Sequence, residues 1–313
     1  MAKKKINPFL GNPKLRNLKF LNLKTFGMER ITNPDSGSHR RIGNNYIINE
    51  KEIEQFHELG YIVLNDVLTD DEMQFLDPWF DHFVLGKEAE HMKKDFCDMS
   101  QPYGTPMEDF QLVNAMLPST YRKELANNIY HEITQHIADQ LYSKGKAAMD
   151  YEQFLAKKPS KKGAEFAMHQ DLGYWPKTEN TWTATFSLAL TDSDLVNGCL
   201  QVLPGTNKES ELRKHFPKSY SSDKKDGGVS RDESHTLVIE ERKDDKIVYL
   251  PVKRGSITVH DERIVHGSAG NESKEWRKTY VAAYRDVETI AKERAIGFTH
   301  SHNDVVNWDN IIS

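Results

Sequence analysis

Cysteine is scarce in this 313-residue chain, which contains only Cys97 and Cys199. The two lie far apart and form no CxxC pair, so the sequence argues against a disulfide framework and a cysteine-rich zinc site. This usage is typical of a reducing compartment, and we expect a cytoplasmic protein. No apolar run approaches the ~20 residues that span a bilayer, so no membrane span is expected. A net charge of −5 gives no general argument for a nucleic-acid partner.

The N-terminal residues differ from the rest of the chain by an excess of basic side chains. Within the first thirty residues only Glu29 opposes the basic residues Lys3, Lys4, Lys5, Lys14, Arg16, Lys19, Lys24 and Arg30. Turn-forming pairs recur without a sustained hydrophobic period, so we expect residues 1–48 to be a basic, irregular N-terminal extension. Three roles stay open: a poorly ordered tail, an organelle-targeting segment, or a segment that folds over the main domain or a partner.

The remaining residues, 49–313, are expected to form a single domain whose first part, residues 49–150, is helical. Asn49 is a suitable cap for a helix over residues 50–59. Gly60 ends that helix, and the next four residues, Tyr61-Ile62-Val63-Leu64, form a short apolar strand. Acidic residues directly after Thr69 indicate the start of a second helix.

A longer helix is expected to begin after Ser119. Its buried stripe is an apolar residue at every fourth position: Leu125, Ile129, Ile133, Ile137 and Leu141. His131 and His136 fall within this helix. Neither has a partner at metal-ligand spacing on the apolar face, so we expect both to be exposed or satisfied in the core.

Short β-like runs replace the helical signals over about residues 151–290. They cover residues 154–156, 183–190, 200–203, 236–239, 247–252, 256–259 and 280–284. Many short strands at this spacing favour an antiparallel barrel or sandwich, here mainly β with flanking α-helices. A polar stretch between Asn207 and Lys246 interrupts them. It is either a solvated insertion or a lid over a substrate.

The most informative short motif is His169-Gln170-Asp171. Residues i and i+2 of an extended segment project to the same face, so His169 and Asp171 can meet one ion. His266 is the expected third ligand. We prefer it to His260, because it follows an apolar pair and precedes Gly-Ser, whereas His260 enters a charged turn. Two imidazoles and one carboxylate are the ligands of an oxygen-activating Fe(II) site that leaves positions open for a 2-oxo acid and O₂. Four further histidines lack such a context, and we expect them to be surface residues: His215, His235, His300 and His302.

Arg277 supports 2-oxoglutarate as the 2-oxo acid. It follows His266 by eleven residues across a turn, so it returns beside His266 if the flanking segments form a strand pair. Its guanidinium suits the distal carboxylate of 2-oxoglutarate, and the Ser268 hydroxyl would bind the same group. A surface salt bridge from Arg277 to Glu272 or Glu275 is the alternative.

These motifs together resemble the phytanoyl-CoA dioxygenase family of Fe(II)/2-oxoglutarate oxygenases. The similarity covers about residues 52–286 in preserved order: Phe56 to Leu64, Val67 to Glu72, Phe154 to Pro159, His169 to Pro176, Asn197 to Thr206 and Gly255 to Arg277. The resemblance implies a double-stranded β-helix, or jelly-roll, of the cupin-like type. It also implies metal ligands His169, Asp171 and His266 and a co-substrate clamp of Arg277 and Ser268. The chain departs from the family pattern at Asn207, where the family has histidine, and at Ser187, where some members have tryptophan.

We therefore expect a dioxygenase that uses Fe(II), 2-oxoglutarate and O₂ to oxidise a small polar metabolite, by hydroxylation, desaturation or ring closure. Tyr174 and Trp175 are candidate substrate contacts, while Lys157, Lys158 and Arg285 are expected to be solvated cations at strand edges. The alternatives are an acyl-CoA 2-hydroxylase-like enzyme, a metalloenzyme that does not use 2-oxoglutarate, and a non-catalytic jelly-roll binding protein. The oligomeric state, monomer or homodimer, stays open.

Overall fold

The computed structural model describes residues 37–142, 146–159, 163–231, 233–240 and 242–305. The basic extension expected over residues 1–48 lies outside these residues as far as residue 36. Its described part contains a 3₁₀ turn, η2 (Ser38–Arg40), and a short hairpin of β1 (Arg41–Ile42) and β2 (Asn45–Tyr46). Arg40 and Arg41 form ion pairs with Glu52 and Glu72, which tie this segment to the helices that follow.

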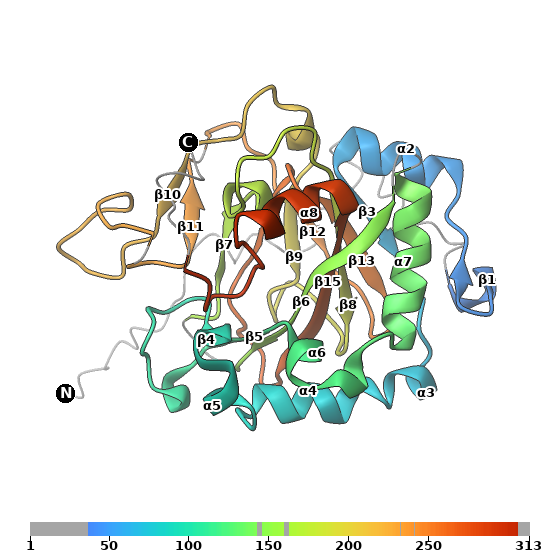
Figure 1. The fold of residues 1–313 in the computed structure, drawn as a ribbon, viewed down its shortest axis with the longest axis horizontal. Helices are drawn as coiled ribbons and strands as arrows, with labels where there is room; N and C mark the ends of the chain where they lie inside the picture. Colours follow the sequence, from blue (N-terminus) through green and yellow to red (C-terminus); the bar gives the residue numbers. More distant parts are fainter. Residues whose placement is uncertain (1–36, 143–145, 160–162, 232, 241, 306–313) are drawn as a thin grey trace, which may run out of the picture. The chain divides into compact units, whose positions relative to one another are not determined.

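Two antiparallel sheets form the centre of the described structure (Figure 1). The large sheet has the order β3 (Tyr61–Leu64), β13 (Ile257–Asp261), β8 (Thr183–Ala189), β15 (Arg277–Asp286), β6 (Ala147–Lys157), β5 (Leu112–Met116) and β4 (Phe96–Asp98). The small sheet has the order β12 (Val248–Leu250), β9 (Leu200–Leu203), β14 (Val265–Ser268) and β7 (Phe166–His169). From β6 to β9 and from β12 to β15, successive strands alternate between the two sheets. This alternation is the winding of a double-stranded β-helix, so the predicted jelly-roll is confirmed.

Helices cover the outer face of the large sheet (Figure 1), where α4 (Leu76–Val84) and α7 (Ile129–Leu141) contact its strands. The predicted caps are confirmed: Asn49 begins α2 (Glu50–Leu59) and Thr69 begins α3 (Asp70–Met73), each with a capping box. The remaining helical elements are short or terminal: α5 (Ala89–Met92), η3 (Lys93–Asp95), η4 (Met107–Asp109), α6 (Pro118–Tyr121), η5 (Lys123–Leu125), η6 (Asp171–Gly173), η7 (Thr206–Lys208) and α8 (Val287–Ala295). None of the helices in the described ranges is long and apolar enough to cross a membrane.

The long helix begins later than the sequence predicts. α7 starts at Ile129, because the Asn128 side chain caps it by accepting from the backbone N–H groups of Tyr130 and His131. Leu125 lies before the helix, in η5, yet it is fully buried and extends the apolar stripe of α7. The expectation of one continuous helix after Ser119 was therefore wrong.

Strand alternation divides the large sheet into two chemically different faces. In β15, Tyr280, Ala282 and Tyr284 belong to the apolar core under the helices, whereas Arg277 and Thr279 line a cavity. β8 repeats this pattern, with Phe186 and Leu188 in the core and Thr185 and Ser187 at the cavity. Residues of the small sheet line the same cavity, which therefore lies between the two sheets.

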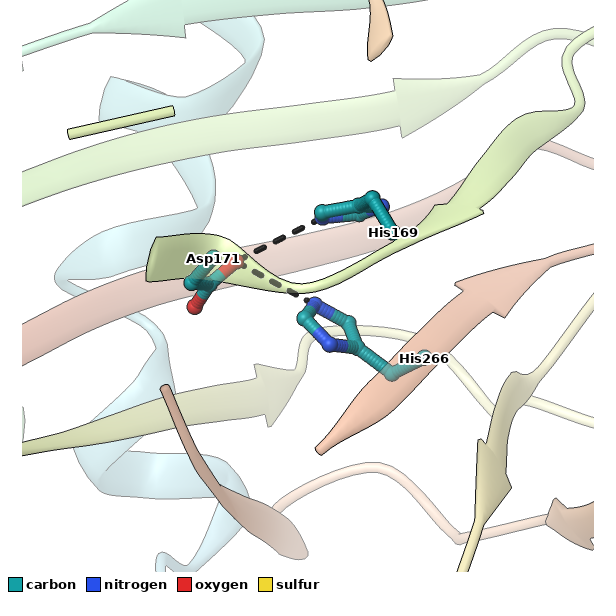
Figure 2. Close-up of side chains that lie close together, drawn as sticks. All are labelled: His169, Asp171 and His266. Atoms are coloured by element: carbon teal, nitrogen blue, oxygen red, sulfur yellow. Dashed lines mark ion pairs between the residues drawn. The ribbon is translucent and has the colours of Figure 1, made fainter. Parts of the chain in front are cut away.

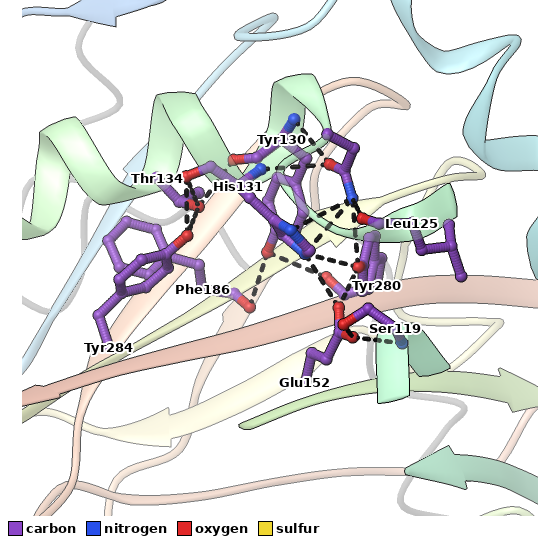
Figure 3. Close-up of polar contacts among 10 residues, drawn as sticks. Ser119, Leu125, Tyr130, His131, Thr134, Glu152, Phe186, Tyr280 and Tyr284 are labelled. Carbon is purple, nitrogen blue, oxygen red and sulfur yellow. Dashed lines mark hydrogen bonds and ion pairs between the residues drawn. The ribbon is translucent and has the colours of Figure 1, made fainter. Parts of the chain in front are cut away.

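A buried polar network joins α7 to the large sheet (Figure 3). Glu152 of β6 is 1% exposed; it lies 2.9 Å from His131 Nε2 and also accepts from the Tyr280 hydroxyl and the Ser119 backbone N–H. Burial alone would raise the pKa of Glu152, but hydrogen bonds from His131, Ser119 and Tyr280 lower it overall. The network gives the buried His131 side chain its hydrogen-bond partners, as the sequence predicts. His136 lies within hydrogen-bonding distance of the Tyr46 carbonyl.

Replacing Glu152 with alanine is expected to lower the free energy of unfolding by about 3–5 kcal/mol, because it leaves buried polar groups without their shared partner. Urea denaturation measures this change. Glu54→Ala on the exposed side of α2 is the control and should cost less than about 0.5 kcal/mol. Equal costs for the two variants would contradict a stabilising role for the network.

Candidate metal centre

His169, Asp171 and His266 come together at the end of the small sheet. β7 pairs with β14 so that His169 and His266 are direct cross-strand partners, and Asp171 begins η6 two residues after His169. Figure 2 shows the two imidazoles directed toward the carboxylate of Asp171. The Nε2 atoms of His169 and His266 lie 3.4 and 3.3 Å from Asp171 Oδ1. The candidate ligand atoms all lie within 4.8 Å of one another, close enough for one metal ion.

Backbone carbonyls orient both imidazoles. His169 Nδ1 lies 2.7 Å from the Ala167 oxygen, and His266 Nδ1 lies 3.0 Å from the Ile264 oxygen. Because a carbonyl only accepts hydrogen bonds, each Nδ1 carries a proton, which leaves each Nε2, the ring atom nearest Asp171, as the atom that can bind a metal. Burial lowers the pKa of both histidines, which favours the neutral form that binds metals.

The two oxygens of Asp171 have different surroundings. Oδ2 accepts a hydrogen bond from Thr185 Oγ1 at 3.0 Å and lies 3.2 Å from His260 Nε2, whereas Oδ1 faces the other two histidines. Burial would raise the pKa of Asp171, but the histidines around it lower the pKa well below its usual value. The carboxylate is therefore ionised, with Oδ1 available to a metal. His260 contacts the other oxygen, Oδ2, in keeping with the preference for His266.

Arg277 and Ser268 line the same cavity, whose volume is about 250 Å³. Arg277 donates to the Gly198 carbonyl at 2.9 Å, while its Nε is buried and has no hydrogen-bond partner. Burial lowers the pKa of Arg277 only to about 10, so the guanidinium stays charged at neutral pH. Within the described part of the chain it forms no ion pair, and the salt bridges considered with Glu272 and Glu275 are not made. A half-buried guanidinium that borders a cavity without a carboxylate partner is suited to an anionic ligand.

The route by which Arg277 reaches the cavity differs from the sequence prediction. β14 and β15 do not pair, because β14 belongs to the small sheet and β15 to the large one. Arg277 and Ser268 thus approach the cavity from its two opposite walls. Lys157 is the cross-strand partner of Arg277. Its ammonium group donates hydrogen bonds to the carbonyls of Ala164, Ser268 and Ala269. Lys157 is 2% exposed, so its expected place as a solvated cation was wrong.

Segments outside the jelly-roll close the rest of the cavity. Tyr174 and Trp175 line it, as do Arg231 from the Asn207–Lys246 stretch and several residues after α8. The Tyr174 hydroxyl also accepts a hydrogen bond from the Leu237 backbone N–H at 2.8 Å. Leu237 begins β11 (Leu237–Ile239), which pairs with β10 (His215–Pro217). The stretch therefore contributes a wall to the cavity, whether or not it moves as a lid.

Three histidines expected on the surface line the cavity instead: His235, His300 and His302. Their placement depends on long-range packing of loops, for which the local sequence carries no periodic signal. His215 is half-buried, and its Nε2 accepts from the backbone N–H of Gln170, between the two motif ligands. Sequence reasoning also missed Thr185, although a polar residue at alternate positions of an apolar strand is a signal for a lined cavity.

A second group of possible metal ligands consists of Asp150, Glu293 and His300. Arg285 donates to both carboxylates, and Arg294 also pairs with Asp150. Arg285 is fully buried, with its guanidinium 4.3 Å from the Trp175 ring centroid, so it is not the strand-edge cation that we expected. Because these arginines already compensate the acids, the group is a structural ion-pair network. Of the two groups found among the described residues, the one around Asp171 has no arginine or lysine ion pair and borders the cavity.

Comparison with known proteins gives one consistent family. The family model described as "Phytanoyl-CoA dioxygenase (PhyH)" matches residues 56–279. Peroxisomal phytanoyl-CoA dioxygenase of Rattus norvegicus is 25% identical over 255 residues, which are 77% of this chain and 69% of that protein.

Two solved structures are similar in fold. EvdO2 from Micromonospora carbonacea var. aurantiaca, complexed with 2-oxoglutarate, has a TM-score of 0.60 at 20% identity and covers 77% of this chain and 92% of its own. EctD from S. alaskensis with bound Fe has a TM-score of 0.56 at 19% identity, and the match covers 77% of this chain and 78% of EctD. The matched residues 56–279 contain the paired β7 and β14 strands, the Asp171 turn and Arg277. The chain therefore belongs to the phytanoyl-CoA dioxygenase family of iron- and 2-oxoglutarate-dependent oxygenases.

Proposed function

We propose that His169, Asp171 and His266 hold iron(II), and that the enzyme oxidises a C–H bond of a small polar metabolite. The observation that carries this proposal is the shared cavity: two neutral imidazoles and one ionised carboxylate border it together with an arginine that has no carboxylate partner. This donor set suits a facial iron site that keeps other positions open. Iron(II) and 2-oxoglutarate, when bound, supply the oxidation of the substrate by O₂ with release of succinate and CO₂.

Arg277 and Ser268 would bind the far carboxylate of 2-oxoglutarate. The guanidinium offers charge-assisted hydrogen bonds from the large sheet, and the Ser268 hydroxyl offers another from the small sheet. Lys157 adds positive charge beside them, although burial, followed by the charge of Arg277, lowers its pKa well below the usual value. The two walls would thus fix the far end of the co-substrate, the metal would hold its other end, and the rest of the cavity would be left to the substrate.

The cavity favours a compact substrate. Its volume of about 250 Å³ would hold 2-oxoglutarate and the reacting part of the substrate, and its lining combines hydroxyls and charges with apolar side chains such as Leu155, Phe166 and Val281. Hydroxylation is the expected outcome, and desaturation or ring closure would follow from the same C–H activation. The similarity to rat phytanoyl-CoA dioxygenase favours a second candidate, hydroxylation of an acyl-CoA. We prefer the small polar substrate, because the cavity is compact and the cations Arg231 and Arg277 border it.

We also propose a cytoplasmic location. Both cysteines are buried and neither forms a disulfide, which suits a reducing compartment.

Removal of a proposed iron ligand tests the metal site. His169→Ala is expected to weaken Fe(II) binding by at least about 10- to 100-fold, since even residues that only support a ligand contribute that much. Anaerobic equilibrium dialysis with metal analysis measures the affinity without requiring turnover. His136→Ala in α7, away from the cavity, is the control, and the same affinity in both variants would contradict the site.

The residues that support Asp171 provide a second test. Thr185→Val and His260→Phe are expected to weaken Fe(II) binding by about 10-fold or more, because Asp171 Oδ2 loses a partner that orients the carboxylate. Both variants should bind iron more tightly than His266→Ala. If His260→Phe were the weaker binder of the two histidine variants, His260 rather than His266 would be the third ligand.

Replacement of Arg277 tests the co-substrate. Arg277→Ala is expected to raise the KM for 2-oxoglutarate by about 10- to 100-fold. This factor corresponds to the loss of one charged hydrogen bond, which contributes about 1.5–3 kcal/mol. Succinate release under air measures it. Lys278→Ala is the control, because Lys278 is the next residue of β15 and pairs with Asp81 on the helix side. Full activity of Arg277→Ala, or turnover without 2-oxoglutarate, would support an oxygenase that does not use this co-substrate, and the absence of any turnover would support a binding protein.

A further inference from the structure

A second part of the cavity lining comes entirely from segments outside the jelly-roll strands. We call it the His235 subsite; it consists of Lys94, Tyr103, Arg231, His235 and His302. Lys94 lies in η3, Tyr103 follows β4, Arg231 and His235 precede β11, and His302 follows α8. The segments that flank β4, precede β11 and follow α8 therefore meet at one place. His302 lies beyond the residues that match the family model, whereas the other four lie within them.

Hydrogen bonds hold these segments together without a ligand. His235 lies 2.8 Å from the Asp98 carbonyl, and the neighbouring Thr236 hydroxyl donates to the Met99 carbonyl at 2.8 Å. The backbone N–H of His302 donates to Asp95 at 2.6 Å. Contacts within the protein therefore position His235 and the backbone of His302 in the subsite.

His235 has an unused hydrogen-bond acceptor. Its side chain is 6% exposed, and the contact of Nε2 with the Asp98 carbonyl requires the proton on Nε2, since a carbonyl only accepts. Burial, together with the nearby His302, lowers the pKa of His235 to about 4, so Nδ1 carries a lone pair at neutral pH. Nδ1 is buried and has no hydrogen-bond partner. A buried acceptor without a donor costs about 1–3 kcal/mol, which a ligand with a suitable donor would recover.

The surroundings of His235 are aromatic and positively charged. The ring centroid of Tyr103 lies 4.2 Å from that of His235, and His302 lies 6.0 Å away on another side. Lys94 Nζ lies 5.5 Å from the Tyr103 centroid, and the Arg231 guanidinium lies 5.2 Å from the centroid of Tyr174. Burial lowers the pKa of His302 to about 4, and the positive charges of Arg231 and Lys94 contribute to this shift.

The described residues that line the cavity include few acids. Among the described residues that line the cavity, the carboxylates are Asp171 and Asp304. Asp304 accepts hydrogen bonds from the backbone and the hydroxyl of Thr299, at 2.6 and 2.8 Å. An ammonium group at His235 Nδ1 would face Lys94 and Arg231 and be repelled. A neutral hydroxyl would not, and an anionic group beside it would be attracted.

We propose that the His235 subsite selects a hydroxylated organic anion as substrate, with its carboxylate or phosphate near Lys94 and Arg231 and its hydroxyl donating to His235 Nδ1. This inference rests on the proposed function, because it names the substrate class of the same cavity. It separates hydroxy acids and phosphorylated polyols from amines and from uncharged molecules.

Calorimetric titration of the anaerobic protein, loaded with iron(II) and 2-oxoglutarate, tests the proposal. Four probes share one carbon skeleton: 3-hydroxybutyrate, butyrate, 3-aminobutyrate and 1,3-butanediol. A fifth probe, glycerol 3-phosphate, presents hydroxyls with phosphate as its only anion. We expect 3-hydroxybutyrate or glycerol 3-phosphate to bind at least about 10-fold more tightly than the other three probes, which corresponds to one hydrogen bond of about 1.4 kcal/mol. Which of the two binds more tightly identifies carboxylate or phosphate as the preferred anion.

Variants of His235 and Lys94 connect this preference to the subsite. His235→Phe should remove the preference for the hydroxyl, and His235→Gln should keep it, because glutamine retains an acceptor. Lys94→Gln should weaken the binding of each anionic probe, while His91→Phe, at an exposed position on α5, should change nothing. Tighter binding of the amine or the diol, no selective binding, or an unchanged preference in His235→Phe would overturn the proposal.

Titration of 2-oxoglutarate into the same variants distinguishes a failure of the proposed substrate class from a failure of the proposed function. Intact 2-oxoglutarate binding with no hydroxyl or charge preference would overturn the substrate class alone. Loss of 2-oxoglutarate binding in the unmodified protein would overturn the proposed function from which it follows.

Discussion

The antiparallel pairing of β7 with β14 is the interaction on which the candidate metal centre depends. Because His169 and His266 are direct cross-strand partners, their imidazoles lie side by side without any loop having to place them. A slip of one residue would turn one of them to the opposite face of the sheet. The Asp171 turn directly after β7 then adds the carboxylate, and Thr185 from the large sheet orients it. The centre thus joins both sheets.

Charge compensation distinguishes the cavity from the rest of the interior. Arg285 is paired with Asp150 and Glu293, and Glu152 is surrounded by hydrogen-bond donors. These networks cost little once formed, because each buried charge has its partners. Arg277 and His235, by contrast, border the cavity with a buried polar atom that has no partner. Buried polar atoms without a hydrogen-bond partner lower the stability of the protein when no ligand is bound. They increase its affinity for ligands that form hydrogen bonds with them.

The sequence predicts features that depend on neighbouring residues. Asn49 and Thr69 begin helices because their side chains bond to the backbone three residues later, and β9 has the bounds expected from its apolar run. The short spacing of His169 and Asp171 placed them together for the same reason. The family resemblance extended this local information to the jelly-roll and to His266.

Features that depend on tertiary packing could not be predicted in the same way. The turn between His266 and Arg277 looks like a hairpin, yet it crosses from one sheet to the other. Arg285 and Lys157 look like solvated cations, but acids and carbonyls from distant segments enclose them. His235, His300 and His302 reach the cavity only because loops and the segment after α8 fold over it. No periodic pattern in the sequence records these contacts.

A crystal structure of the protein grown without oxygen, in the presence of iron(II) and 2-oxoglutarate, tests the central claim most directly. Our account predicts one iron bound by His169 Nε2, Asp171 Oδ1 and His266 Nε2, with the far carboxylate of 2-oxoglutarate on Arg277. Iron bound by His260, or at the group formed by Asp150, Glu293 and His300, would contradict it. So would 2-oxoglutarate bound without contact to Arg277.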